Sequence, residues 1–169
     1  MKHPALLFAA AMLAMAELRG QTIGGSIEAP EGARVLMQAK GDGVQVYTCT
    51  ETQNVRKWVL KGPEAKLLDL RGKVIGTHFA GPTWKLSDGG IVQGEVVASK
   101  PAPDPGSVAW LLLRAKPGTA SGSLGSITFI RRTETQGGVA SAAGCQDAGD
   151  IGKTVEVPYS ATYTFYAAK

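Results

Sequence analysis

The chain has 169 residues, of which 44% are hydrophobic and 19% are charged, and its formal net charge is +4. This hydrophobic content can bury one sizeable core, so the length predicts a single domain and the composition excludes an intrinsically disordered chain. The 22 glycines and the low content of charged residues exclude a coiled coil, which needs long runs rich in Ala, Glu, Lys and Leu.

Residues 1–16, MKHPALLFAAAMLAMA, have the pattern of a secretory signal peptide: a short basic start, an apolar run and small residues before Glu17. The apolar run is about twelve residues long, whereas a membrane-spanning helix needs roughly twenty. No cysteine lies near the junction, which argues against a lipid-modified N-terminus. We therefore predict cleavage after Ala16 and export to the periplasm or the extracellular space, with no transmembrane anchor left after cleavage.

The basic residues are scattered along the chain. Only Arg56–Lys57 and Arg131–Arg132 are adjacent basic pairs, and neither is interleaved with aromatic residues as in single-strand nucleic-acid binders. One of the 18 basic residues, Lys2, also belongs to the signal segment. The charge pattern therefore predicts a solvated surface and no nucleic-acid partner.

Two cysteines are present, Cys49 and Cys145. Their separation excludes a C-x-x-C redox motif and a zinc knuckle. Because an even number of cysteines in an exported chain is typical of structural disulfides, we predict that Cys49 and Cys145 are bonded to each other.

Hydrophobic residues alternate with a period of two in nearly every segment after the signal peptide, which predicts an all-β domain over residues 17–169. In chain order, we expect a first hairpin of strands 35–40 and 44–50 around a turn at Gly41–Asp42–Gly43. Strands 58–61 and 66–70 flank Gly62–Pro63–Glu64, and the chain then turns into a strand at 73–79. Strands 84–86 and 91–98 form the clearest hairpin, joined by Ser87–Gly90.

A proline-rich segment at 99–106 is interpreted as a surface connection inside one domain. The strand 108–115 is apolar on both faces until Arg114, as expected for a strand covered on both sides. A strand at 127–132 and a small-residue loop at 139–152 precede the last strand, 155–166, in which Pro158 indicates an edge or a bulge. In total, these segments predict about nine strands, arranged as either a β-sandwich or a closed β-barrel.

Several separated motifs occur together in one order: VQVYTC (44–49), HFAGPTW (78–84), WLLLRA (110–115), ITFIRRTETQGG (127–138), the isolated Cys145 and VPYSATYTFY (157–166). This pattern resembles an uncharacterised family of exported bacterial and fungal proteins known as domain of unknown function 3455. The resemblance covers about residues 24–168. It implies export and one β-rich domain, and it assigns no catalytic roles. Its family-like positions are Cys49, His78, Trp84, Trp110, Arg131 and Cys145.

No motif for a cofactor is present: there is no dinucleotide-binding G-x-G-x-x-G between a strand and a helix, no phosphate loop and no G-x-S-x-G elbow. We therefore expect no cofactor and no metal site. His78 is the only histidine outside the signal segment. It is interpreted either as a buried imidazole satisfied by the backbone or as a functional residue acting with a carboxylate such as Asp69 or Asp88.

The candidate ligand-binding residues are His78, Trp84, Lys85 and Asp88, which lie within one short segment around a Gly-Pro turn. An aromatic ring with polar groups on a loop is typical of a small-molecule or glycan site. Core packing is the alternative for Trp84.

Four further residues are assigned by their positions in strands. Trp58 and Trp110 are predicted to lie in the core, because both belong to apolar strands, and Tyr159 and Tyr163 are expected to pack inward with their hydroxyls at a wet end.

Arg131 and Arg132 should point to opposite faces of their strand. An arginine on the inner face would need a carboxylate such as Glu134 or Glu156, or would bind an anion.

Three functions fit these observations. The leading one is a non-enzymatic exported domain with a binding or envelope-structural role. A small hydrolase or isomerase that uses His78 with a carboxylate is the alternative, and a stress or interaction protein recognised through an exposed sheet edge is the third. The sequence names no ligand and no oligomeric state.

Overall fold

The computed structural model describes residues 25–168 and contains eight strands and two short 3₁₀ helices. The predicted signal segment, residues 1–16, lies outside the described residues. The strands are β1 (Arg34–Thr52), β2 (Val55–Leu68), β3 (Val74–Phe79), β4 (Thr83–Leu86), β5 (Ile91–Lys100), β6 (Trp110–Ala115), β7 (Ile127–Gly137) and β8 (Thr154–Ala167), and the helices are η1 (Gly122–Leu124) and η2 (Ala148–Asp150). Within residues 25–168, no helix has the length and apolarity needed to cross a membrane.

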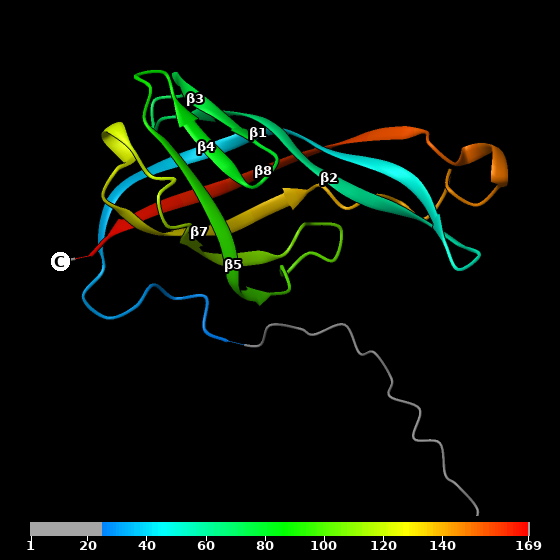
Figure 1. Cartoon of the computed structure of the whole chain (residues 1–169), viewed down its shortest axis with the longest axis horizontal. Coiled ribbons are helices and arrows are strands. Elements are labelled where there is room, and N and C mark those ends of the chain that lie inside the picture. Colours follow the sequence, from blue (N-terminus) through cyan, green and yellow to red (C-terminus); the bar gives the residue numbers. More distant parts are fainter. Residues whose placement is uncertain (1–24, 169) are drawn as a thin grey trace, which may run out of the picture.

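The strands form one closed antiparallel barrel in which each strand pairs with its neighbours in sequence and β8 returns to pair with β1 (Figure 1). The predicted all-β class is confirmed, and of the two allowed architectures the barrel is the one formed. Closure leaves no strand of the sheet unpaired along its whole length on either side, which is one of the ways that antiparallel sheets avoid edge-to-edge association, although parts of β2 and β5 pair on one side alone.

The first predicted hairpin is wrong, because residues 41–43 lie inside the continuous strand β1. Neither Gly41 nor Gly43 has a positive φ. A Cβ at Gly41 would lie 2.6 Å from Cε2 of Tyr163, and one at Gly43 would lie 2.2 Å from the carbonyl oxygen of Glu64. These glycines therefore allow close approach of a ring and of a neighbouring backbone, and they do not turn the chain.

The segment Gly62–Pro63–Glu64 likewise lies inside a strand, β2, where the register with β1 shifts between Val46 and Tyr47. Pairing of β2 with β3 begins only at Glu64, so Pro63 has a strand partner on one side alone. The true turn between β1 and β2 is at Gln53 and Asn54, which have φ values of 51° and 63°. Positive φ at both central residues is the geometry of a type I′ hairpin turn.

Other predictions agree with the structure. The hairpin of β4 and β5 is confirmed, with a turn at residues 87–90 in which the Asp88 carboxylate accepts a hydrogen bond from the Gly90 amide. Pro158 pairs with Val44 of β1, whereas pairing with β7 ends at Tyr159, so β8 has a free side where its proline lies.

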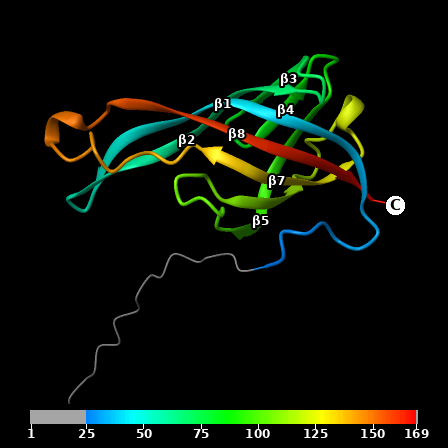
Figure 2. The same cartoon turned by 180° about the vertical axis from the view of Figure 1, so that it is seen from behind.

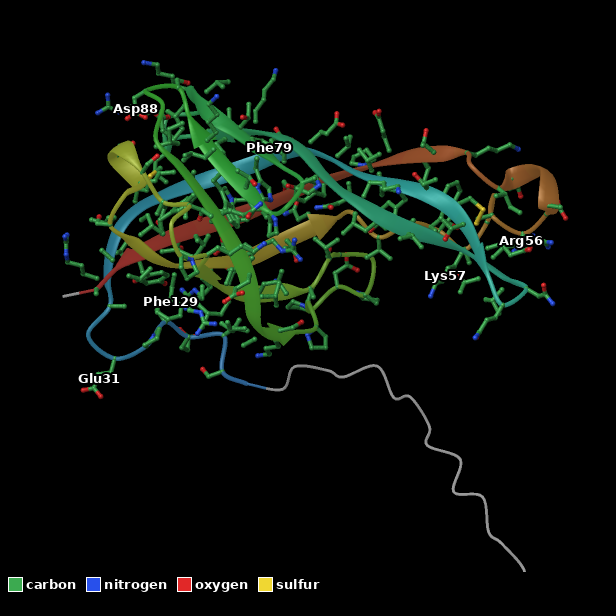
Figure 3. The ribbon with its side chains drawn as sticks, viewed as in Figure 1. Glu31, Arg56, Lys57, Phe79, Asp88 and Phe129 are labelled. Carbon is green, nitrogen blue, oxygen red and sulfur yellow. A yellow bond between two sulfur atoms is a disulfide. The ribbon has the colours of Figure 1, made fainter. Side chains whose placement is uncertain are left out.

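The strands β1, β2 and β8 continue past the barrel as a three-stranded ribbon, the sheet extension, made of residues 47–52, 55–60 and 154–157 (Figures 1 and 2). Arg56 and Lys57 are at its tip (Figure 3). The loop 138–153 folds over one face of the extension and is bonded to it by the Cys49–Cys145 disulfide. Trp58 donates to the carbonyl of Ala143 in this loop, so it packs under the loop and not in the barrel core as predicted.

Two apolar clusters bury the hydrophobic residues. The larger cluster fills the barrel and includes Trp84, Leu113, Tyr163 and Phe165. The smaller cluster lies outside the barrel wall and includes Ile27, Ala98 and Leu112, with Trp110 and Phe129 against it. The N-terminal segment therefore covers the outer face of β5, β6 and β7, as the position of Phe129 near this segment shows (Figure 3). Both faces of β6 are therefore covered, as predicted, one by the barrel cluster and the other by the smaller cluster. The prediction that Trp110 lies in the core is wrong, because its side chain packs against the smaller cluster outside the barrel.

We expect removal of the disulfide to destabilise the protein strongly. The two cysteines are 96 residues apart in sequence, and closing so long a loop restricts the unfolded chain. The variant Cys49→Ala/Cys145→Ala should lose about 2–5 kcal/mol of unfolding free energy in urea denaturation. Reduced wild-type protein should match the double variant. Two thiols that alkylate in the native protein without reductant would contradict the bond.

We expect Gly41→Ala to destabilise the barrel by about 1–3 kcal/mol, because the added methyl group overlaps the buried ring of Tyr163. Gly149→Ala is the matched control: no atom lies within 4 Å of its added Cβ. It should stay within about 0.5 kcal/mol of the wild type. Equal effects of the two substitutions in thermal or urea unfolding would show that close packing does not require glycine at position 41.

Candidate functional site

A cavity of about 280 Å³ occupies one end of the barrel interior. Its rim includes the exposed residues Leu60, Lys61, Gly81 and Val96, and its deep part is formed by buried side chains. The polar or aromatic residues of the lining are Gln45, Lys61, His78, Trp84, Arg132 and Tyr163. No acidic residue belongs to this lining as far as the structure describes the chain.

His78 and Trp84 are placed side by side by the short hairpin of β3 and β4, in which they are directly paired. Both side chains point into the barrel and are buried, with 2% and 1% of their surface exposed. Their rings stack with centroids 4.5 Å apart and an interplanar angle of 13°. The ring of Tyr163 packs edge-on against both, at 4.9 Å from His78 and 5.5 Å from Trp84. Three aromatic rings from β3, β4 and β8 thus form one wall.

His78 is neutral at physiological pH. The pKa of its imidazole is lowered to about 3, chiefly by burial and in smaller part by the nearby Arg132 cation, while a hydrogen bond with the Thr83 carbonyl opposes this shift. Nδ1 lies 2.8 Å from the carbonyl oxygen of Thr83, which can only accept, so Nδ1 carries the proton. In the neutral ring the other nitrogen, Nε2, is then a hydrogen-bond acceptor.

Gln45 enters the cavity from β1, and only 1% of its surface is exposed. Neither the amide nitrogen nor the amide oxygen of its side chain has a hydrogen-bond partner among the described residues, and Nε1 of Trp84 is in the same state. Leaving a buried donor or acceptor unpaired costs about 1–3 kcal/mol, and most buried polar groups in native proteins are paired. Two donors and one acceptor are therefore available at this cavity.

Arg132 reaches the cavity from β7. Its Nε and Nη2 donate to the carbonyl oxygen of Ala109, at 3.0 and 2.8 Å. The carboxylate partners considered from the sequence are not used: Glu134 accepts a hydrogen bond from Thr162, and no ion pair of Arg132 with an acidic residue is present within the described part of the chain. The guanidinium charge therefore faces a cavity that contains no negative side chain.

Arg131 points to the other side of β7, as the alternation of a strand requires. It forms an ion pair with Glu28 of the N-terminal segment and lies 5.9 Å from the ring centroid of Tyr166. The two adjacent arginines thus have separate environments, one outside the barrel wall and one at the cavity.

Two tyrosine hydroxyls are buried near the cavity. Those of Tyr159 and Tyr163 lie 3.3 Å apart, and burial raises the pKa of both groups, so both stay protonated. Tyr163 contributes to the lining itself. A protonated hydroxyl can donate a hydrogen bond to a ligand as well as accept one.

The structure divides the candidate residues of the segment 78–88 into two pairs. His78 and Trp84 line the cavity, whereas Lys85 and Asp88 do not. Lys85 is exposed on the outer face of β4 because it follows the inward-facing Trp84. Asp88 lies at the end of the barrel remote from the sheet extension (Figure 3), and its pKa is lowered by hydrogen bonds from Gly90 and Ser123.

Gln45, Arg132 and Tyr163 complete the site, and they come from β1, β7 and β8, far from the candidate segment in sequence. The alternation at Arg131–Arg132 indicated that one arginine could face inward. Nothing in the local sequence marked Gln45. Among the described residues, no three His, Cys, Asp or Glu side chains gather closely enough to hold a metal ion.

The buried neutral state of His78 predicts a pH dependence of stability. In the unfolded chain this histidine takes up a proton near pH 6.5, whereas the folded protein takes it up only near pH 3. The unfolding free energy should therefore be constant above about pH 7 and fall below pH 6.5, with a slope that approaches about 1.4 kcal/mol per pH unit. In the variant His78→Asn, urea denaturation between pH 5 and 7 should give a flatter profile. Identical slopes for the two proteins would contradict a buried neutral imidazole.

Residues 30–167 match the family model described as "Protein of unknown function (DUF3455)". No curated protein and no solved structure matches the sequence. The family match covers all eight strands, and it therefore includes every polar residue of the cavity described above. The chain belongs to the DUF3455 family, as its motifs implied.

Proposed function

We propose that this protein is an exported binding protein that holds a small organic molecule in the cavity at the end of its barrel. The observation that carries the proposal is the unpaired state of the buried Gln45 amide and of Trp84 Nε1 beside the cavity. Unpaired buried polar groups lower the stability of the free protein, and a ligand that supplies their hydrogen-bond partners removes this cost on binding.

The size and lining of the cavity support a small ligand. Its volume of about 280 Å³ is near the lower end of the range for ligand pockets, about 300–1,000 Å³. Apolar walls from Leu111, Leu113 and Val96 combine with a few polar groups, which is the usual composition of such pockets. One ring of a glycan or a comparably small molecule fits this volume better than an extended chain.

The enzymatic alternative, a hydrolase or isomerase that uses His78 with a carboxylate, has less support. No acidic side chain is found in the described lining. A histidine with a pKa of about 3 is also a weak base at neutral pH, where general bases work best with a pKa near the ambient pH. Binding without chemistry is therefore the function that this arrangement of groups favours.

Export is supported by two features. The signal-like segment 1–16 precedes the domain, and the Cys49–Cys145 disulfide is of the kind that persists in oxidising compartments. We therefore place the binding function in the periplasm or the extracellular space. The third hypothesis, recognition through a sheet edge, is limited to strand segments that pair on one side alone, such as residues 55–63 of β2 and 95–100 of β5, because the strands otherwise close into a barrel.

The variant Gln45→Met tests the proposal, because methionine has a similar volume and removes the unpaired amide. It should raise the unfolding free energy by about 1–3 kcal/mol and abolish the binding of small polar compounds in a thermal-shift or ligand-observed NMR screen. Residues selected for binding commonly lower the stability of the free protein in this way.

Gln136→Met on the exposed side of β7 is the matched control and should change neither stability nor binding. The proposal fails if Gln45→Met binds the same compounds as the wild type with equal affinity. It also fails if a broad screen finds no compound that binds the wild type.

A further inference from the structure

We infer that the molecule held in the cavity is an organic carboxylate whose negative group is received by Arg132 and whose apolar body lies against Leu111 and Leu113. This inference rests on the proposed function and specifies the class of ligand. It is carried by the charge of the lining, by the directions of its hydrogen-bonding groups and by the missing partner of Arg132.

The charge of the lining is entirely positive. Arg132 and Lys61 are the charged residues of the described lining, and both are cations. Arg132 is half-buried, and pairing with an acidic group or an anion is favourable for a guanidinium that is partly withdrawn from water. The sequence left two partners open for an inward-facing arginine, a carboxylate of the chain or an external anion. Glu134 is engaged with Thr162, so an external anion is the partner that fits.

The position of Arg132 is fixed by the chain itself. Two of its nitrogens donate to the Ala109 carbonyl, which anchors the guanidinium at the wall, and the guanidinium also interacts with the hydroxyl of Tyr163. The side chain is only partly buried, and its charge contributes to the lowered pKa of His78 and opposes the larger effect of burial, which raises the pKa of Tyr163. A preorganised arginine that forms no ion pair with an acidic residue of the described chain is suited to a charge-assisted hydrogen bond with the carboxylate of a ligand.

The remaining polar groups include donors for oxygen atoms on the ligand, beside two acceptors, the amide oxygen of Gln45 and Nε2 of His78. Unpaired donors are supplied by the amide nitrogen of Gln45 and by Nε1 of Trp84, and the protonated hydroxyl of Tyr163 can also donate. Lys61 at the exposed rim adds a positive charge along the way in, which attracts an anion from solution. The apolar residues of the wall match a ring-sized or short-chain body better than a bare inorganic ion.

The experiment compares isosteric pairs of ligands at pH 7 on the purified protein. Benzoate, cyclohexanecarboxylate and hexanoate are each measured against their primary amides by calorimetry or ligand-observed NMR. A charge-assisted hydrogen bond to arginine contributes about 1.5–3 kcal/mol, so the best carboxylate should bind roughly 10- to 100-fold more tightly than its amide. Inorganic phosphate, which lacks an apolar body, should bind more weakly than that carboxylate.

Substitutions then locate the contact. Arg132→Gln should remove the preference for carboxylate over amide, and Arg132→Lys, which keeps the charge, should retain part of it. The matched control is Arg131→Gln, the same change at the adjacent residue on the other side of β7, and it should leave the preference unchanged. If Arg132→Gln does not fold, because it also loses the bonds to Ala109, the comparison of Arg132→Lys with wild type still tests the inference.

The possible failures are distinguishable. If carboxylates and amides bind equally well and Gln45→Met abolishes both, the carboxylate inference is wrong and the binding function stands. If phosphate binds as tightly as the best carboxylate, the apolar body has no role and the inference is also wrong. If no compound of either set binds and the broad screen with wild type is negative, both the inference and the proposed function are wrong.

Discussion

The antiparallel pairing of β1 with β8 is the constraint on which the rest of the structure depends. It runs from Arg34 to Thr48 along β1 and joins the first strand of the chain to the last, which closes the sheet into a barrel. Closure requires very close contact, and Gly41 provides it by leaving room for the Tyr163 ring. Without this pairing, Gln45 on β1 and Arg132 on β7 would have no common interior to face.

The barrel interior is divided between packing and polar groups. The helix η1 lies at the end away from the sheet extension (Figures 1 and 2), and its Leu124 belongs with Ile127 and Phe165 to the buried apolar cluster of the barrel. At the other end, Gln45 and Trp84 leave polar atoms unpaired beside the cavity. The first end and the disulfide supply stability, and the second end lowers it, which is the distribution expected of a rigid scaffold that carries a binding site.

The protonation state of His78 in the cavity depends in part on the charge of Arg132. Because Arg132 and burial both disfavour a protonated imidazole, His78 stays neutral and adds no second positive charge to the interior. Its Nδ1 is held by the Thr83 carbonyl, within the hairpin that also orients Trp84. The aromatic wall is therefore an uncharged surface next to the fixed guanidinium of Arg132, and the proposed ligand, with an apolar body and one anionic group, would contact both.

Alternation of apolar and polar residues determined from the sequence alone that the domain is all-β and that Arg131 and Arg132 face opposite ways, whereas Lys85 was grouped with Trp84 and the structure places it on the outer face. Cysteine number and the signal-like segment determined the disulfide, because only one pairing is available. The course of the chain at Gly41–Asp42–Gly43 was decided by tertiary structure, since a glycine that permits close approach and a glycine that turns the chain have the same local sequence. The site was decided in the same way: barrel closure brings residues from β1, β7 and β8 to His78 and Trp84, and no local pattern encodes which distant strands will share an interior.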